Sequence, residues 1–171
     1  MKALGGIRVD RGSGSDEPLR AAEDALAAGE IVAIMPQGTI PRGPAFFDPV
    51  LKGRWGAVKL AEACGAPVIP IGLWGTENVW PRSLRLPNLT NLLDPPTVRI
   101  RVGQPVELKH RSVDADTRRM MKAISELLPD VAREHREPSA EDLARTYPGG
   151  VVPDDMGAAA GHESDRRPGT D

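Results

Sequence analysis

The chain has 171 residues and a mass of 18.3 kDa, which suits one domain and not two. Its single cysteine excludes an internal disulfide framework and a zinc site built from cysteines. No apolar run approaches the roughly 18 residues of a membrane span. The net charge of −2 is uneven, because residues 41–111 carry ten basic and five acidic groups. This basic middle suits an anionic ligand or an anionic lipid surface, although a solvated face with uneven charge is the simpler alternative.

The first third of the chain predicts a strand, a helix and a second strand. Ile7–Val9 reads as a short strand, and the residues after Ser15 read as a helix that ends at Gly29. One face of this helix carries Leu19, Ala22 and Leu26. Residues 31–35 form a near-continuous apolar run, which predicts a strand buried on both faces, as in a parallel sheet.

The same alternation continues after a Gly- and Pro-rich loop over residues 36–53. The apolar spacing predicts a helix from about Arg54 to Gly65, and residues 67–73 read as another buried strand. This order favours an α/β fold with a mostly parallel sheet flanked by helices.

The remaining residues predict a strand over 98–102 with one solvent-exposed face, and a helix over 114–136 that Pro129 kinks. Residues 137–171 carry eight acidic and three basic groups and few large apolar side chains. We therefore expect a domain over residues 1–136 followed by a disordered acidic tail over residues 137–171.

The loop after residues 31–35 is the richest candidate site. Gly38 and Thr39 offer backbone N–H groups and a hydroxyl at the end of a predicted strand, where α/β sheets bind ligands, and Gln37 adds an amide. Arg42 supplies a partner for a phosphate. Arg11 follows the first predicted strand and lies at the same edge if the sheet is parallel. The alternative is an ordinary Pro/Gly loop.

Three blocks of sequence resemble the lysophospholipid acyltransferase family, typified by 1-acylglycerol-3-phosphate acyltransferase. Gly5–Arg11 is similar to the family's second block, and Met35-Pro36-Gln37-Gly38-Thr39 is similar to its third. A basic residue before Gly-Ala follows in the family, as Arg54 does here before Gly56 and Ala57. Residues 67–71 are similar to the fourth block, so the resemblance covers about residues 5–110.

The family's catalytic block, His-x4-Asp, is absent from this chain. The residues five positions after its three histidines are Ala115, Ala140 and Arg167. In the family, the histidine is the general base for the acceptor hydroxyl and the aspartate orients it. The resemblance therefore implies a glycerolipid-acyltransferase-like fold without its amino-terminal part, inactive as given. Gln37 and Ile40 also replace a glutamate and an arginine of the third block.

The resemblance further implies the substrates and the location of the protein. The acyl donor is acyl-CoA or acyl carrier protein, and the acceptor is a lysophosphatidate-like lysophospholipid in phosphatidic acid and phospholipid synthesis. Arg11, Gln37, Gly38, Thr39 and Arg42 would bind this acceptor. No metal, prosthetic cofactor or nucleic acid is implied, and we expect peripheral membrane contact at the cytoplasmic, inner face of the plasma membrane. The alternatives are a non-catalytic lipid- or partner-binding member of the fold, and an unrelated phosphate-binding α/β module.

Overall fold

The computed structural model of the chain describes residues 5–7, 17–87 and 93–153. The predicted strand at residues 7–9 and the N-cap at Ser15 lie mostly outside these residues, so they stay predictions. The elements in chain order are α1 (Glu17–Ala27), the 3-10 helix η2 (Gly43–Phe47), α2 (Gly56–Cys64), β1 (Ile71–Trp74), α3 (Thr76–Val79), β2 (Arg99–Val102), α4 (Val113–Leu127), the 3-10 helix η3 (Asp130–Ala132), α5 (Ala140–Arg145) and the 3-10 helix η4 (Pro148–Gly150).

Two of the predicted helices are confirmed. In α1 the side chain of Ala22 is buried, and Gly29 follows the helix with a φ of 80°. In α2 three residues are buried, and Gly65 closes the helix in the left-handed conformation with a φ of 62°. Glycine is favoured at such a position because it has no Cβ that would oppose positive φ. The periodic spacing and the closing glycine therefore locate both helices correctly.

The sheet differs from the prediction. β1 and β2 pair antiparallel, with Ile71 opposite Val102 and Trp74 opposite Arg99, and a further bridge joins Val68 to Val106. This two-stranded sheet is the whole sheet within the described residues, so the expected mostly parallel sheet is not found there. The mixture of helices and strands is still consistent with an α/β domain.

The predicted strand over residues 31–35 is wrong for the structure. These residues are assigned neither helix nor strand, and the exposed fraction is 96% for Ile31 and 79% for Met35. An apolar run becomes a buried strand only where neighbouring strands satisfy its backbone and other layers cover its side chains. No described strand pairs with residues 31–35, so the first condition is not met. The exposure of Ile31 and Met35 shows that the second condition is not met either.

Burial on both faces is also wrong for the strand at residues 67–73. Ile71 and Leu73 are exposed on one face of β1, and Ile69 just before this strand is exposed too. On the other face α4 covers the strand, because the Cβ of Leu127 lies 2.7 Å from the place where a Cβ of Gly72 would stand. Among the described residues, therefore, helices cover only one face of the sheet.

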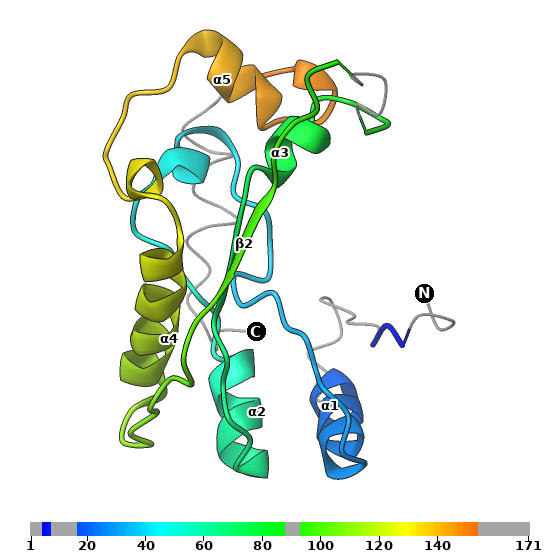
Figure 1. Ribbon diagram of the computed structural model, residues 1–171, viewed down its shortest axis with the longest axis vertical. Coiled ribbons are helices and arrows are strands. Elements are labelled where there is room, and N and C mark those ends of the chain that lie inside the picture. The colour runs from blue at the N-terminus through cyan, green and yellow to red at the C-terminus, as the bar shows by residue number, and fades with distance from the viewer. Residues whose placement is uncertain (1–4, 8–16, 88–92, 154–171) are drawn as a thin grey trace.

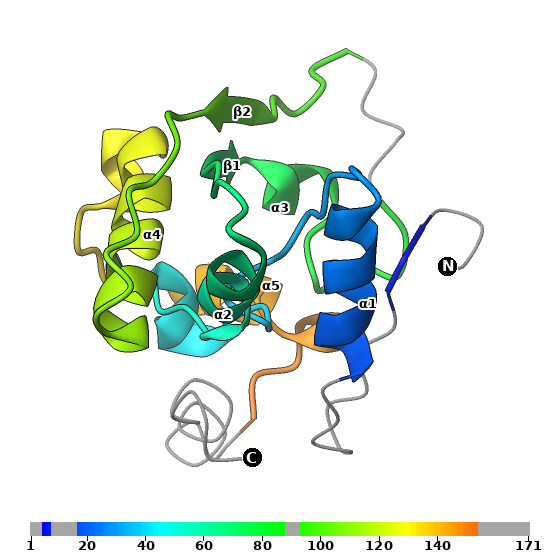
Figure 2. The same cartoon turned by 90° about the horizontal axis from the view of Figure 1, so that it is seen from below.

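The helices form a row beside this sheet. α2 lies between α1 and α4 and contacts both, and α4 also contacts β1 (Figures 1 and 2). The buried core joins α2 to α4 through Val58, Met120 and Met121. Around it pack the partly buried side chains of Leu51, Ala57, Val68, Leu108, Val113 and Ile124. The segment that leads into α2 is thus anchored on α4.

The C-terminal part of the fold corrects two further expectations. α4 ends at Leu127, so Pro129 terminates this helix instead of kinking it. Proline lacks the N–H that helix continuation requires. α5 begins with a capping box between Ser139 and Asp142, and Tyr147 after it is buried. Residues 139–150 thus hold defined elements where the sequence predicts disorder. The domain boundary at residue 136 stays a prediction, and residues 154–171 lie outside the described residues.

Candidate functional site

The loop that carries the candidate site begins with a tight turn. The backbone N–H of Gly38 donates to the carbonyl oxygen of Met35 at 3.0 Å, with Pro36 as the second residue of the turn. Gly38 has a φ of 70°, which only glycine adopts at low cost. Gln37, Gly38 and Thr39 are half-buried. The structure therefore brings these three predicted site residues together in one short loop.

Arg54 lies directly across this turn. Its backbone N–H donates to the carbonyl oxygen of Pro36 at 2.8 Å. Its side chain passes over Gly38, with Cδ and Nε at 2.7 and 2.8 Å from the position of a Cβ at residue 38. A side chain at residue 38 would therefore meet Arg54. Because glycine has no side chain, the guanidinium group of Arg54 can lie over the backbone of the loop. There it can bind an anion bidentately.

The second half of the loop carries Arg42 and is held from two sides. Arg42 is half-buried and stands at the start of η2, immediately before the buried Gly43. The backbone N–H of Gly43 donates to the hydroxyl of Thr146 at 2.8 Å. On the other side Arg82 donates from its guanidinium to the carbonyl oxygen of Ile40 at 3.2 Å. Arg42 is thus carried by a segment with fixed ends.

The structure does not place Arg11, Arg99 or Arg101 at this loop. Arg11 lies outside the described residues, so its place at the site stays a prediction. Arg99 and Arg101 are exposed on β2, but Ile100 and Val102 are exposed as well, so the prediction that only one face of this strand is solvent-exposed is wrong. The two arginines lie on a different element from the loop that carries Arg42 and Arg54.

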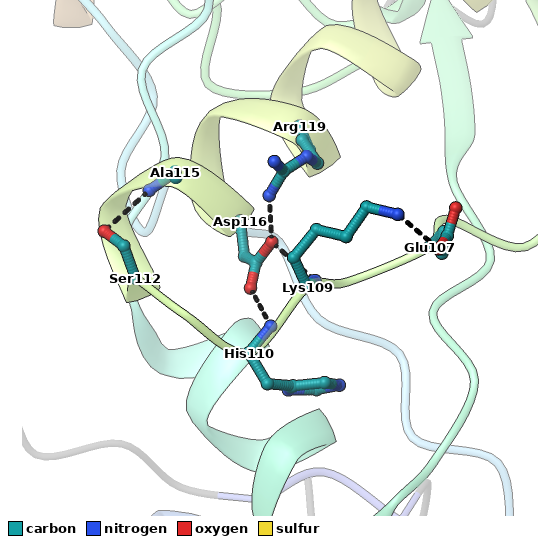
Figure 3. Close-up of polar contacts among 7 residues, drawn as sticks. All are labelled: Glu107, Lys109, His110, Ser112, Ala115, Asp116 and Arg119. Atoms are coloured by element: carbon teal, nitrogen blue, oxygen red, sulfur yellow. Dashed lines mark hydrogen bonds and ion pairs between the residues drawn. The ribbon is translucent and has the colours of Figure 1, made fainter.

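A second polar cluster surrounds Asp116 at the start of α4, and it is structural. The fully buried carboxylate accepts hydrogen bonds from the backbone N–H groups of Lys109 at 2.9 Å and His110 at 2.8 Å, and from the guanidinium of Arg119. Figure 3 shows that the imidazole ring of His110 extends away from this carboxylate. The aspartate therefore holds the backbone of the β2–α4 connection and does not orient the His110 ring for proton transfer.

The environment of Asp116 stabilises its charged form. The backbone N–H of Lys109 is the largest cause that lowers the pKa of this carboxyl from its usual range. Burial opposes the shift, and the His110 backbone N–H and Arg119 add to the lowering of the pKa. Asp116 is therefore ionised at neutral pH and is unsuited to act as a general base near pH 7.

Comparison with known proteins supports one family. Residues 1–74 match the family model described as Acyltransferase. This span includes the loop over residues 35–43 and also Arg54, so the match and the geometry concern the same part of the chain. The match supports the acyltransferase family, and with it acyl transfer as the general class of activity. No curated protein and no solved structure matches the chain.

Two features are absent from the described residues. Among them, no group of three or more His, Cys, Asp or Glu side chains is arranged to hold a metal ion. Within residues 5–7, 17–87 and 93–153, no helix has both the length and the apolar character needed to cross a membrane.

Sequence reasoning missed three residues of this region. Arg54 had a signal, since it is the basic residue before Gly56 and Ala57 in the stretch that resembles the acyltransferases, but it was not placed in the site. Thr146 and Tyr147 had none, because they follow the loop by about 100 residues and lie in a segment whose composition is typical of disorder. Only the fold brings them to Gly43.

Proposed function

We propose that this chain is a lysophospholipid-acyltransferase-family protein of the 1-acylglycerol-3-phosphate type that binds the acceptor of the reaction. Such enzymes transfer an acyl group from acyl-CoA or acyl carrier protein to the free hydroxyl of a lysophosphatidate-like acceptor. The observation that carries the proposal is the passage of Arg54 over Gly38, because it adds a guanidinium to a loop that already presents Thr39 and is followed by Arg42. Guanidinium groups bind phosphate bidentately, which suits the acceptor headgroup.

The proposed roles follow from the chemistry of each group. Arg42 and Arg54 bind the phosphate, and Arg11 is a third candidate for this role. Gln37 and Thr39 have an amide and a hydroxyl that can hydrogen-bond the glycerol oxygens. Gly38 has to be glycine because of its positive φ and its contact with Arg54. No metal ion or prosthetic group takes part in this proposal.

The chemical step requires a base that removes the proton of the acceptor hydroxyl as its oxygen attacks the thioester carbonyl and the thiol leaves. None of the three histidines in the chain is followed by an aspartate five residues later. We therefore assign acceptor binding, and not proton transfer, to the residues of this chain, and we expect no turnover from the chain alone.

A membrane surface is the proposed source of the acceptor. Ile31, Met35 and Ile40 flank the loop, and each exposes more than half of its side chain. Large exposed apolar side chains beside a basic loop suit a peripheral contact with anionic lipid. This supports peripheral membrane contact, and the inner, cytoplasmic face of the plasma membrane is the location that the resemblance implies.

A non-catalytic lipid- or partner-binding role is the second candidate. It is favoured by the cluster around Asp116, where the carboxylate bonds the backbone of His110 and not its ring. Such a protein would bind the same phosphorylated acceptor without an acyl donor.

Calorimetric titration of the full chain tests the proposal. We expect binding of glycerol 3-phosphate and of lysophosphatidate, weakened by salt, and weaker binding of adenosine monophosphate. Tighter binding of the nucleotide would favour a soluble phosphate-binding module instead. Binding of an acyl-CoA in the same experiment would separate the acyltransferase from a non-catalytic lipid-binding protein.

A further inference from the structure

The segment that follows α5 contacts the proposed acceptor loop through two buried residues. Thr146 and Tyr147 have exposed fractions of 4% and 3%. The hydroxyl of Thr146 accepts the backbone N–H of Gly43 at 2.8 Å and donates to the carbonyl oxygen of Leu143 at 2.7 Å. This hydroxyl thus joins the loop to the last turn of α5.

Tyr147 fills the space that the missing side chain of Gly43 leaves. Its hydroxyl oxygen lies 2.6 Å from the position of a Cβ at residue 43, and Gly43 has a φ of 56°. This hydroxyl is buried and has no hydrogen-bond partner among the described residues. The hydroxyl end of the ring therefore contacts Gly43 by packing and not by a hydrogen bond.

The residues that precede Thr146 and Tyr147 are also held in place. The capping box of Ser139 and Asp142 starts α5, and Arg136 lies over the ring of Phe47 in η2, with its guanidinium carbon 5.1 Å from the ring centre. Arg145 donates to the side-chain oxygen of Asn78 at 3.3 Å. These contacts attach α5 and the residues before it to η2 and to α3.

We propose that Thr146 and Tyr147 are positioning residues of the acceptor site, which hold Gly43 and thereby set the place of the adjacent Arg42. The inference rests on the proposed function, because Arg42 is assigned there to the phosphate of the acceptor. Phosphate recognition by a guanidinium depends on the direction of its N–H groups, so a loosened Gly43 lowers affinity without removing any charge.

Two readouts on the full chain test this inference. The first is hydrogen exchange of the Gly43 amide, and the second is the dissociation constant of glycerol 3-phosphate. Thr146→Val removes the acceptor of the amide, so we expect about tenfold faster exchange and about tenfold weaker binding, which corresponds to the net value of one buried hydrogen bond. Thr146→Ser keeps the hydroxyl and should restore both.

Four further variants separate positioning from other roles. Thr76→Val makes the same change at an exposed threonine of α3 and should alter neither readout. Tyr147→Phe keeps the ring and should preserve binding, whereas Tyr147→Ala should weaken it. Thr146→Val should cause no further loss of affinity in a chain that already carries Arg42→Ala, because the two changes act through one contact.

The outcomes are distinct. Unchanged exchange at Gly43 in Thr146→Val, or unchanged affinity in a chain that binds glycerol 3-phosphate, overturns the positioning role and leaves the proposed function standing. Loss of binding in Tyr147→Phe with unchanged exchange at Gly43 overturns it too, because the hydroxyl would then act on the ligand directly and not through Gly43. A wild-type chain that does not bind glycerol 3-phosphate overturns the proposed function and this assignment together, whatever the exchange at Gly43 shows.

Discussion

The side chain of Arg54 crosses the backbone of Gly38, with its Cδ 2.7 Å from the place that a Cβ of residue 38 would occupy. A glycine with positive φ thus makes room for the guanidinium that completes the candidate loop. This pair links two segments that the sequence separates by a Gly- and Pro-rich stretch.

Gly38→Ala should displace Arg54 and weaken the binding of glycerol 3-phosphate. The new methyl group meets the middle of a flexible side chain, which can move, and the positive φ adds a strain of about 1–2 kcal/mol. Gly29→Ala is the matched control, because Gly29 has a φ of 80° and no other described atom lies within 4 Å of its Cβ position. Both variants should lose similar thermal stability, but affinity should fall only in Gly38→Ala.

Arg54→Ala and Arg42→Ala should each weaken the binding of glycerol 3-phosphate by about one to two decades. A charge-assisted hydrogen bond contributes roughly 1.5–3 kcal/mol, and 1.4 kcal/mol is tenfold. We expect a similar loss of affinity in Arg11→Ala, because the resemblance to the acyltransferase family places Arg11 among the acceptor-binding residues. Arg99→Ala and Arg101→Ala remove exposed charges from β2 and should change affinity only through salt-dependent attraction. Equal losses in all five variants, measured at two salt concentrations, would show that diffuse charge alone attracts the ligand.

Asp116→Ala should lower the free energy of unfolding by about 2–3 kcal/mol. The substitution leaves the backbone N–H groups of Lys109 and His110 without their acceptor, and such unsatisfied donors are costly. Asp130→Ala is the control, because Asp130 pairs with Arg133 at an exposed position and should cost no more than about 1 kcal/mol. Urea unfolding of the two variants measures the difference, and similar losses would contradict a structural role for Asp116.

The same carboxylate should make stability depend on pH in the acid range. The pKa of Asp116 is lower in the folded chain than in the unfolded one, whose value is about 3.9. The unfolded chain then binds more protons, so this contribution is complete above the unfolded pKa and is lost as pH falls toward the folded pKa. Urea midpoints at about pH 6 and pH 3 should therefore differ less in Asp116→Asn than in the wild type. The variant should keep some dependence, because the pKa values of Glu107 and Asp142 are lowered too.

Removal of residues 139–171 should destabilise the domain. This truncation deletes Thr146 and Tyr147, and loss of a buried aromatic side chain costs about 3–5 kcal/mol. A chain that ends at residue 153 is the control, since dispensability stays a prediction for residues 154–171. Thermal unfolding of both chains compares them. An unchanged midpoint for the shorter chain would contradict the packing of Tyr147 on Gly43.

The apolar pattern of the sequence located α1, α2 and the start of α4, whereas α3 and α5 were not predicted. Apolar spacing and the closing glycines placed α1 and α2, and the motif over residues 35–39 identified the segment that the family match later included. These features are local, because a helix face, a cap or a tight turn is defined by residues within a few positions of one another. Gly38 belongs to this group, since its N–H closes the turn that begins at Met35.

Only the tertiary structure decided which segments are covered and which are joined. Residues 31–35 are apolar, yet they are exposed because no described strand pairs with them. Residues 140–150 are polar in composition, yet their buried Tyr147 packs on Gly43, and a capping box starts their helix. Burial depends on what another segment places opposite a residue, and a contact such as Gly43 with Thr146 spans 103 positions. No pattern within either segment carries that information, so local periodicity determined the helices while chain packing determined the sheet and the surroundings of the site.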